Sequence, residues 1–370
     1  MFKKKILSTL LAVGLSATFL VGCGAGGDET ASSSDKVNVK LLVTGALGDK
    51  GINDSANAGA EKIKEQFGDK VDVEVVEMGF DQTKFEPALI DASESDADVI
   101  ITGGWDMKEH VENTAEQYPD KKFLIYDTDV NYDEYNLENV YSMTYKQNEA
   151  GFLAGTLAAL VTTSDMELAN PEKVIGFVGA RDTSAVINDF LVGYIEGAKF
   201  VDKDMKVEVA YVGSFTDTAK AKELTLAQYS NGADVVFTSA GPASAGSVEA
   251  ARDSKKYVIG VDSDQALAYE GKEEQKYIIS SALKRVDNSL ALTMESFLND
   301  KLEFNSHNVL GAKEGVIELA ENDIYTSTVK EEIRNKVAET TEQLKSGKIT
   351  VNTALGMKEA KLKEIINSAK

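Results

Sequence analysis

Histidine and cysteine are almost absent from this 370-residue chain, which has two histidines and one cysteine. Metal sites of the zinc-finger or His-Glu-x-x-His kind need several such ligands at fixed spacing, and His110 and His307 have no such spacing. A lone cysteine, Cys23, also excludes an intramolecular disulfide. We therefore expect no metal and no cofactor, and we expect both histidines at the surface or at helix ends.

Sequence motifs of catalysis are also missing. The chain has no Gly-x-Ser-x-Gly elbow and no Gly-x-x-x-x-Gly-Lys-[Ser/Thr] phosphate loop. Residues 22–27 match Gly-x-Gly-x-x-Gly, but they precede every predicted strand, so the match has no structural context. A Ser-His-Asp triad that forms only in the folded chain stays open. We predict no catalytic residue, and an enzyme is not expected.

Positive charge is scarce, with 39 Lys and Arg against 61 Asp and Glu, a formal net charge of −22. Such a chain does not attract nucleic acid or an anionic membrane surface electrostatically. Its composition, 43% hydrophobic and 27% charged, is that of an ordinary soluble globular protein. A small-molecule ligand is therefore expected rather than a nucleic acid, and the protein is expected to be a monomer.

One apolar run stands at the amino terminus. Lys3, Lys4 and Lys5 precede residues 6–21, and the run ends in Leu-Val-Gly-Cys at Cys23. A basic segment, a short apolar segment and small residues predict a secretory signal, and its end resembles a bacterial lipobox. We predict a signal peptide at 1–22, lipidation of Cys23, a flexible tether at 23–36, and attachment to the outer face of the cell membrane. Cleavage removes three lysines and no acid, which leaves a charge of about −25.

After the tether, strand-like and helix-like segments alternate, which predicts βαβ units in a mostly parallel sheet covered on both faces. The predicted strands are residues 37–44, 71–77, 97–102, 122–126, 139–145, 173–178, 206–212, 233–238, 257–261 and 277–283. The predicted helices are residues 53–67, 83–92, 106–117, 148–161, 184–200, 218–230, 244–253 and 287–299. The tail adds a β-like segment at 315–319 and helices at about 327–344 and 358–370.

Two stretches of the chain repeat. Residues 97–102 (Ala-Asp-Val-Ile-Ile-Thr) recur as 233–238 (Ala-Asp-Val-Val-Phe-Thr), and 121–125 (Lys-Lys-Phe-Leu-Ile) recur as 255–259 (Lys-Lys-Tyr-Val-Ile). The second pair leads to Asp127 and to Asp262. Repeats in the same order predict two α/β lobes of one design. A cleft between the carboxyl edges of their sheets is where such folds bind small ligands.

Polar and aromatic residues at predicted strand ends are the candidate ligand contacts, because backbone N–H groups and short side chains converge there. The loop at 48–54 leads from the first strand into a helix and contributes two of them. The candidates are Asp49, Asn53, Trp105, Asp127, Phe215, Asp217, Gly241, Asp262 and Lys284. Each also has a structural alternative: a helix cap for an aspartate, core packing for Phe215, or a solvated pair of Lys284 with Arg285.

The same stretches resemble the basic-membrane-protein (Bmp/PnrA-like) lipoproteins, the nucleoside-binding subunits of ABC importers. The similarity runs from about residue 37 to about 351. The matching stretches are residues 48–53, 118–123, 213–217, 232–235, 259–265 (Ile-Gly-Val-Asp-Ser-Asp-Gln) and 283–287. The resemblance implies a type I periplasmic-binding-protein fold, with two doubly wound lobes, a hinge and a central ligand cleft.

The resemblance also implies a ligand and its contacts. It implies a purine nucleoside between the lobes, with Asn53 and Asp127 at the base and Phe215 stacked on it. Gly241, Asp262 and Lys284 would hold the ribose. Permease and ATPase subunits are the implied partners. The sequence alone does not show whether Asp262 or Asp264, and Asp127 or Asp129, faces the ligand.

One residue departs from the family pattern, since Ile52 stands where an aromatic ring is usual. Trp105 is a possible substitute, and a pyrimidine nucleoside or another small polar solute stays open. Two other functions stay open as well: a membrane-tethered ligand sensor and a secreted nucleoside hydrolase. We expect an N-terminal lobe of residues 37–145 with about 285–312, a C-terminal lobe of 146–284 with about 313–350, and a tail of 351–370.

Overall fold

The computed structural model describes residues 36–370. The predicted signal peptide, Cys23 and the tether up to residue 35 lie outside these described residues. Within residues 36–370, every helix is too short or too polar to cross a bilayer.

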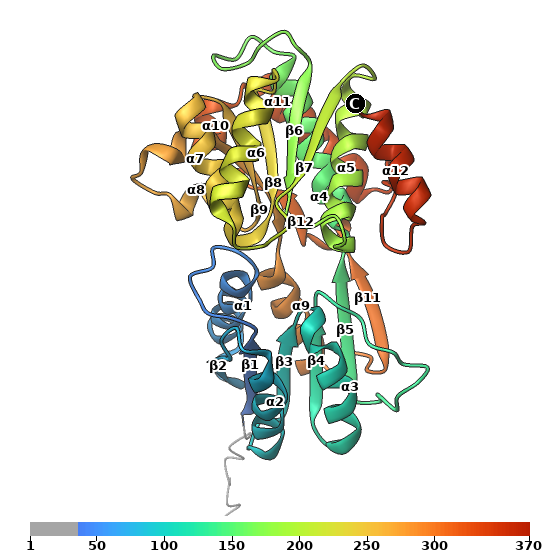
Figure 1. The fold of residues 1–370 in the computed structure, drawn as a ribbon. Helices are drawn as coiled ribbons and strands as arrows, with labels where there is room; N and C mark the ends of the chain where they lie inside the picture. Colours follow the sequence, from blue (N-terminus) through green and yellow to red (C-terminus); the bar gives the residue numbers. More distant parts are fainter. Residues whose placement is uncertain (1–35) are drawn as a thin grey trace, which may run out of the picture. The chain divides into compact units, whose positions relative to one another are not determined.

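Two six-stranded sheets form the framework (Figure 1). The first contains β1 (Val37–Val43), β2 (Val71–Glu77), β3 (Val99–Gly103), β4 (Lys122–Tyr126), β5 (Val140–Tyr145) and β11 (Ser306–Leu310). The second contains β6 (Val174–Gly179), β7 (Lys206–Tyr211), β8 (Val235–Ser239), β9 (Tyr257–Asp262), β10 (Ile278–Lys284) and β12 (Ile317–Leu319). We call each sheet with its helices a lobe.

The strand orders, β11-β5-β4-β3-β1-β2 and β12-β10-β9-β8-β6-β7, correspond position by position. The repeated sequence stretches therefore occupy equivalent places, β3 with β8 and β4 with β9. Every named pair of strands is parallel except β10 and β12, which are antiparallel. The predicted pair of related α/β lobes is confirmed.

Helices cover both faces of each sheet. The first lobe has α1 (Ile52–Phe67), α2 (Phe85–Glu94), α3 (Lys108–Gln117) and α9 (Val286–Leu298). The second has α4 (Gln147–Thr162), α5 (Ala185–Val201), α6 (Thr218–Ser230), α7 (Ser244–Ser254), α8 (Gln265–Ala268), α10 (Asp323–Thr328), α11 (Glu331–Lys345) and α12 (Glu359–Ser368). Short 3₁₀ turns are η1 (Gln82–Lys84), η2 (Trp105–Met107), η3 (Gly241–Ala243), η4 (Glu273–Tyr277) and η5 (Ala312–Glu314).

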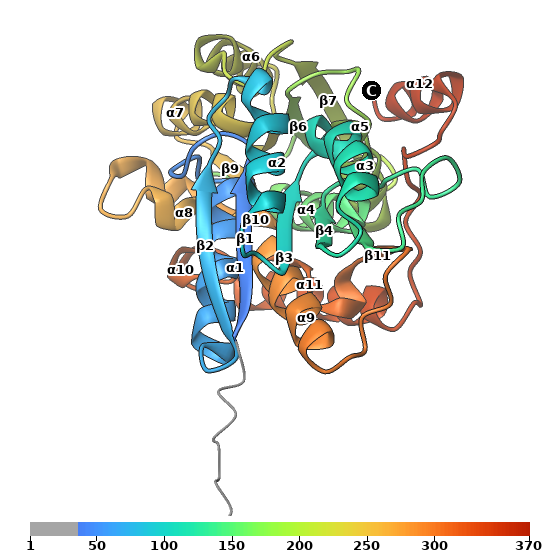
Figure 2. The ribbon, with the colours of Figure 1, turned by 90° about the horizontal axis from the view of Figure 1, so that it is seen from below.

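Both faces of the first sheet are apolar, as a doubly covered parallel sheet requires. Leu42 and Ile100 pack in one cluster with residues of α2 and α3. Their neighbours Leu41 and Ile101 pack in the other cluster with residues of α1 and α9. Figure 2 shows these two helix pairs on opposite sides of the strands. Successive side chains of each strand point to opposite faces of the sheet, so each strand packs against helices on both faces.

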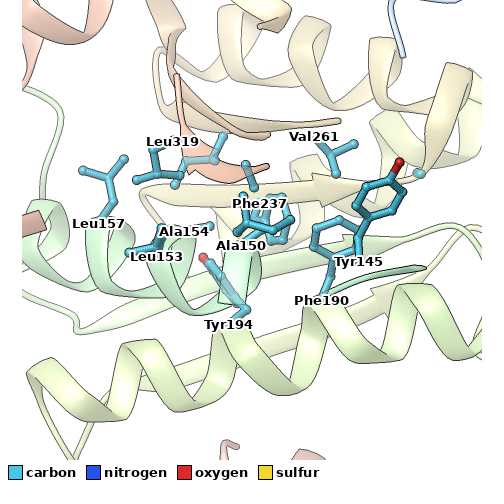
Figure 3. Close-up of a cluster of buried hydrophobic side chains, with 14 of the residues drawn as sticks. Tyr145, Ala150, Leu153, Ala154, Leu157, Phe190, Tyr194, Phe237, Val261 and Leu319 are labelled. Atoms are coloured by element: carbon cyan, nitrogen blue, oxygen red, sulfur yellow. The ribbon is translucent and has the colours of Figure 1, made fainter. Parts of the chain in front are cut away.

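The core of the second lobe centres on the pair α4 and α5 (Figure 3). Helix α4 is buried on almost every side, so it was recognisable as an apolar helix but carries no amphipathic stripe. Glycines of both helices allow a close approach: a Cβ built on Gly151 of α4 would lie 2.1 Å from the carbonyl oxygen of Phe190, and one built on Gly193 of α5 would lie 1.9 Å from that of Asn148. Phe190, Tyr194 and Phe237 then fill the space against the sheet.

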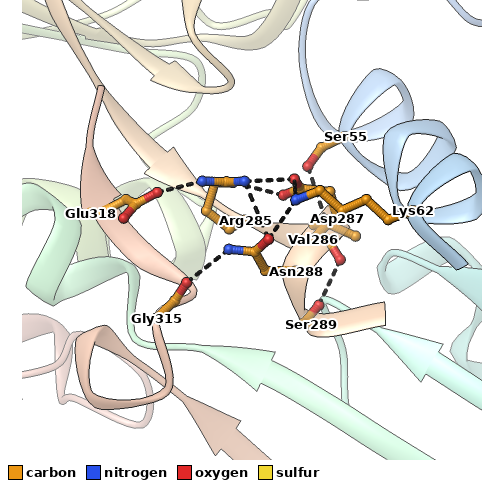
Figure 4. Close-up of polar contacts among 9 residues, drawn as sticks. All are labelled: Ser55, Lys62, Arg285, Val286, Asp287, Asn288, Ser289, Gly315 and Glu318. Carbon is orange, nitrogen blue, oxygen red and sulfur yellow. Dashed lines mark hydrogen bonds and ion pairs between the residues drawn. The ribbon is translucent and has the colours of Figure 1, made fainter. Parts of the chain in front are cut away.

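The chain passes between the lobes three times, at β5 to α4, at β10 to α9, and at β11 to β12. Arg285, in the second passage, joins the lobes through side chains (Figure 4). Its guanidinium donates to both carboxylate oxygens of Asp287 at 2.8 Å and pairs with Glu318 of β12. Lys62 of α1 pairs with the same Asp287. These ion pairs hold the second passage to α1 of the first lobe and to β12 of the second lobe.

The structure differs from the sequence prediction mainly in the last third of the described chain. Strand β11 and helix α8 were not predicted. The helix predicted at about 327–344 is α11, which begins four residues later because the chain is extended at Val329 and Lys330; α10 before it was not predicted. Helix α12 packs on α5, and the carbonyl of Ala369 accepts from the N–H of Val207 in β7, so this segment is docked rather than free.

Candidate functional site

A cavity of about 470 Å³ lies between the carboxyl edges of the two sheets. Seven of the nine candidate ligand contacts line it, from both lobes. They are Asp49, Trp105, Asp127, Phe215, Gly241, Asp262 and Lys284. A wider groove of about 1060 Å³ on the first lobe also includes Trp105, but none of the other six. The interlobe cavity is therefore the candidate site.

Asp127 and Asp262 reach this cavity through the same backbone geometry. Asp127 follows β4 and Asp262 ends β9, the equivalent strands of the two sheets. Both are in the left-handed region, at φ of 60° and 66°. This conformation is uncommon for residues with a side chain, although aspartate tolerates it better than most, and it concentrates at functional sites. The repeat in the sequence thus delivers one carboxylate from each lobe.

Lys284, at the end of β10, lies between these two carboxylates. Its ammonium is 2.9 Å from Oδ1 of Asp127 and 3.8 Å from Oδ1 of Asp262, and its side chain is only 3% exposed. Burial works to lower the pKa of Lys284, but the two aspartates outweigh it and the pKa is raised. The lysine is therefore charged at neutral pH, and the solvated pair with Arg285 is ruled out.

Asp262 is less well satisfied than Asp127. Its Oδ1 atom is buried and accepts no hydrogen bond within residues 36–370. Burial raises the pKa of this carboxyl, Lys284 works against the rise, and Asp127 adds to it. A buried acceptor without a donor is costly, and a ligand hydroxyl or N–H group would supply one.

The neighbouring aspartates that the sequence could not separate have other partners. Asp264 caps α8 through the N–H of Ala266 and accepts two bonds from the amide of Asn322. Asp129 pairs with Lys108 at 3.1 Å. Neither lines the interlobe cavity. Asp127 and Asp262 are the members of each pair that face it.

Phe215 and Gly241 form one wall. The ring of Phe215 has the guanidinium carbon of Arg181 5.4 Å from its centroid. Gly241 has φ of +57°, and a Cβ built there would come within 3.3 Å of the Phe215 ring. Glycine therefore serves here both for its backbone conformation and for its small size. Trp105, 53% exposed, lies at the rim common to the cavity and the wider groove.

The loop from Gly48 to Asp54 is shaped by its own acids. The carboxylate of Asp49 accepts from the N–H groups of Gly51, Asn53 and Asp54 at 2.8–3.2 Å, so it caps α1. Asp54 in turn accepts from the N–H groups of Gly48 and Lys50 at 2.7 and 2.9 Å. Asp49 therefore lines the cavity and also caps a helix, which was the structural alternative for this aspartate.

Two of the nine candidates do not line the cavity. Asp217 caps α6 by accepting from the N–H of Lys220 at 2.9 Å. Asn53 is the other. Its side chain is 5% exposed and donates to the carbonyl of Thr44 at 3.1 Å. The amide oxygen is buried with no donor among the described residues. The structure thus places Asn53 behind the loop rather than at its surface. The predicted contact of Asn53 with a base stays a prediction, because Asn53 is not among the residues that line the cavity.

Besides the ion pair of Lys284 with Asp127, Lys50 makes contacts between the lobes at the cavity. Its carbonyl accepts from Ser263 Oγ and from Gln265 Nε2, each at 2.5 Å. Its ammonium donates to the carbonyl of Ala268 at 3.2 Å and lies 4.5 Å from the ring centroid of Tyr269. Tyr269 and Gln265 also line the cavity. None of these contacts was predicted, because they depend on how two distant loops meet.

Further lining comes from the amino end of α5, which the sequence analysis did not consider as part of the site. Ser184, Val186, Ile187 and Phe190 contribute an apolar floor with one hydroxyl. Within residues 36–370, His, Cys, Asp and Glu side chains nowhere gather in threes that could hold a metal ion. The cavity therefore offers carboxylates, ammonium groups, hydroxyls and rings, which suits a polar organic molecule with planar and hydroxylated parts.

Comparison with known proteins gives the family. Residues 36–352 match the Bmp family model, described as ABC transporter substrate-binding protein PnrA-like. Basic membrane protein A1 of Borrelia garinii subsp. bavariensis is 30% identical over 78% of this chain and 81% of its own length. The ABC transporter nucleoside-binding protein BmpA of Lactococcus lactis subsp. cremoris is 29% identical over 94% of this chain and 99% of its own length.

Solved structures agree on the fold. A solute-binding protein of an ABC transporter system from Aeropyrum pernix K1 has a TM-score of 0.74 at 24% identity, covering 90% of this chain and 97% of that one. Another, from Conexibacter woesei DSM 14684, has a TM-score of 0.71 at 22% identity, covering 86% and 99%. With the family model spanning most of the sequence, this chain belongs to the PnrA-like (Bmp) family of ABC transporter substrate-binding proteins, which bind and do not catalyse.

Proposed function

We propose that this protein binds a nucleoside, most favourably a purine nucleoside, between its lobes and delivers it to the permease of an ABC importer. The observation that carries the proposal is Lys284, buried between one carboxylate of each lobe in a cavity walled by an aromatic ring. A cis-diol can accept from an ammonium and donate to two carboxylates at once. This is the pattern that a ribose fits.

Further support comes from the walls and from the relatives. Phe215 offers a ring face to a planar base, and Gly241 leaves room for the sugar beside it. The cavity volume of about 470 Å³ lies in the range of small-ligand sites. One relative, similar over nearly its whole length, is named a nucleoside-binding protein. In this proposal Asp127, Asp262 and Lys284 bind the ribose and Phe215 stacks on the base.

Attachment to the membrane is part of the proposal. Acylation of Cys23, in the motif Leu-Val-Gly-Cys, would hold the protein at the outer face of the membrane. The residues between Cys23 and the first strand would act as a tether that keeps the binding protein near its permease and raises its effective concentration there. Metabolic labelling with a fatty-acid analogue tests this, since Cys23→Ala should abolish the label.

The nucleoside proposal is tested by calorimetry with inosine, guanosine, adenosine, uridine and ribose. We expect at least one nucleoside to bind, and ribose alone to bind much more weakly. Asp262→Asn should weaken the binding of that nucleoside by tenfold or more, because a charged acceptor is lost. The matched control is Asp264→Asn, two residues away and outside the cavity, which should change affinity by less than twofold.

A result in which no nucleoside binds would remove the proposal. The sensor alternative uses the same site, and no contact within residues 36–370 favours it. Release of free base from inosine would support a hydrolase and contradict a binding protein. No such activity is expected, since the family consists of binding proteins.

A further inference from the structure

We infer that Lys50 contacts the ligand and makes the site prefer nucleosides whose base carries a carbonyl oxygen, such as the 6-oxopurines, over adenosine. This inference rests on the proposed function and assigns a role to a residue that the sequence analysis did not select. It starts from the contrast between the two lysines that line the cavity, Lys50 and Lys284.

The two lysines differ in their ionic partners. Lys284 is held by Asp127 and Asp262, so its charge is matched inside the protein. Lys50 has no carboxylate within 4 Å among the described residues, although the chain as a whole carries a net charge of −22. Twenty-one ion pairs form within residues 36–370, and none includes Lys50. Its ammonium is thus available to an uncharged acceptor.

Lys50 also retains donor capacity. An ammonium group has three N–H bonds. One goes to the carbonyl of Ala268 at 3.2 Å, and the ring of Tyr269 lies 4.5 Å away. A further N–H is left for an oxygen of a molecule in the cavity. The hydrogen bond would be charge-assisted and so stronger than one between neutral groups.

The backbone of Lys50 is fixed before any ligand arrives. The residue has φ of +54°, its N–H donates to Asp54 Oδ2 at 2.9 Å, and its carbonyl accepts from Ser263 and Gln265. A left-handed lysine is uncommon and needs such support. Because the main chain is held on both sides, the side chain starts from a defined position, which reduces the entropy lost when a ligand binds.

The charge of the lining favours a carbonyl over a phosphate. Three aspartates, Asp49, Asp127 and Asp262, face two lysines in the cavity. This excess of negative charge repels a nucleotide. A neutral 6-oxopurine carries an oxygen acceptor that Lys50 can donate to, whereas adenosine carries an amino group, a donor, at the same ring position. The site should therefore bind bases that carry an oxo group more tightly than bases that carry an amino group at the same position.

Titration calorimetry of the full chain with inosine, guanosine, adenosine and inosine 5′-monophosphate tests the inference. We expect the wild-type protein to bind inosine about tenfold more tightly than adenosine, and the monophosphate more weakly than inosine. Lys50→Met should remove this difference in affinity: inosine should bind about tenfold more weakly, and the affinity for adenosine should change less than twofold. Lys50→Gln serves as a second variant if the first fails to fold.

Lys272→Met is the matched control. Its ammonium lies 5.4 Å from the same Tyr269 ring, but the residue is exposed and outside the cavity lining. It should leave both affinities unchanged. Equal binding of inosine and adenosine by the wild type, an equal loss for both in Lys50→Met, or tightest binding of the monophosphate would each overturn the inference. In all three cases a nucleoside still binds, whereas failure of the proposed function would show as no nucleoside binding.

Discussion

At the scale of single residues, three residues of the site have strained backbone conformations. Lys50, Asp127 and Asp262 all have left-handed backbones and all line the same cavity. Each such residue raises the energy of the folded chain by roughly 1–3 kcal/mol. Their occurrence at one cavity, at equivalent strand ends in two cases, indicates that the geometry of the site is maintained against local stability.

Asp262→Asn is expected to stabilise the ligand-free protein while it weakens ligand binding. Burial raises the pKa of Asp262, so the folded state favours the neutral carboxyl that asparagine mimics. The gain should be on the order of 1 kcal/mol at pH 7–8, from relief of a buried charge with an unpaired oxygen. The check is the free energy of unfolding of both proteins in denaturant.

The pH dependence of that gain follows from the direction of the shift. A folded pKa above the unfolded value means that ionised Asp262 lowers stability above its folded pKa, and that this penalty disappears below the unfolded value near 3.8. The difference between Asp262→Asn and wild type should therefore be largest at neutral pH and shrink as the pH falls toward 4. A difference that grows on acidification would contradict this account.

Gly241→Ala is expected to weaken ligand binding about tenfold, because the new methyl group would press on Phe215 at 3.3 Å. Gly271→Ala is the matched control: it also has a positive φ, +74°, but nothing lies within 4 Å of its added Cβ. Both variants should lose roughly 1 kcal/mol of stability from backbone strain. Only Gly241→Ala should lose affinity, as measured by calorimetry.

At the scale of elements, the sequence predicted most of the fold and left out what depends on long-range pairing. Parallel strands such as β4 and β9 are short apolar runs, visible without partners. Strand β11, Ser-His-Asn-Val-Leu, has a largely exposed pattern and becomes a strand only by pairing with β5, more than 160 residues away. Helix α8 has only four residues, too few for a periodic pattern.

The same distinction applies to the site. Asp127 and Asp262 were recognisable because they follow strands whose sequences repeat, and Lys284 because it follows a predicted strand. Lys50 and Tyr269 were not, because their contact joins two loops that meet only when the lobes do. Asn53 looked equivalent to Asp49 in the sequence, yet the turn at Gly51 directs it inward to Thr44. Loop conformation decides these cases, and local sequence does not specify it.

Helices α4 and α5 lead to a prediction at this scale. Gly193→Ala would raise helix propensity by about 1 kcal/mol in an isolated helix. Here it should instead destabilise the protein by roughly 1–3 kcal/mol, because the new Cβ would overlap the Asn148 carbonyl at 1.9 Å and force the helices apart. Chemical denaturation measures the loss.

The control for Gly193→Ala is an exchange between alanine and glycine at a solvent-exposed helix position. Ala58→Gly, at an exposed position of α1, should lower stability by about 1 kcal/mol through propensity alone. If Gly193→Ala proved more stable than wild type, the close approach of α4 and α5 would not be limiting. The four glycines at positions 151, 155, 193 and 197 would then need another explanation.

At the scale of the whole molecule, the lobes are joined in two different ways. The three passages of the chain are covalent, and the Arg285 ion pairs lie beside one of them, outside the cavity lining. The contacts of Lys50 with Ser263, Gln265, Ala268 and Tyr269 are reversible and lie at the cavity itself, as does the ion pair of Lys284 with Asp127. Opening the cleft must break the second set and bend the first. The Lys50 contacts thus form a latch across the cleft.

Gln265→Ala is expected to weaken this latch without removing the site. Its amide donates to the Lys50 carbonyl, and Ser263 retains the other bond to the same oxygen. Loss of one hydrogen bond of about 1 kcal/mol should raise the rate of ligand release about fivefold, seen by stopped-flow fluorescence of Trp105. The radius of gyration of the ligand-free protein should also rise in small-angle scattering. Gln117→Ala, at the exposed end of α3, is the control, and equal release rates in the two variants would mean that the latch does not hold the cleft closed.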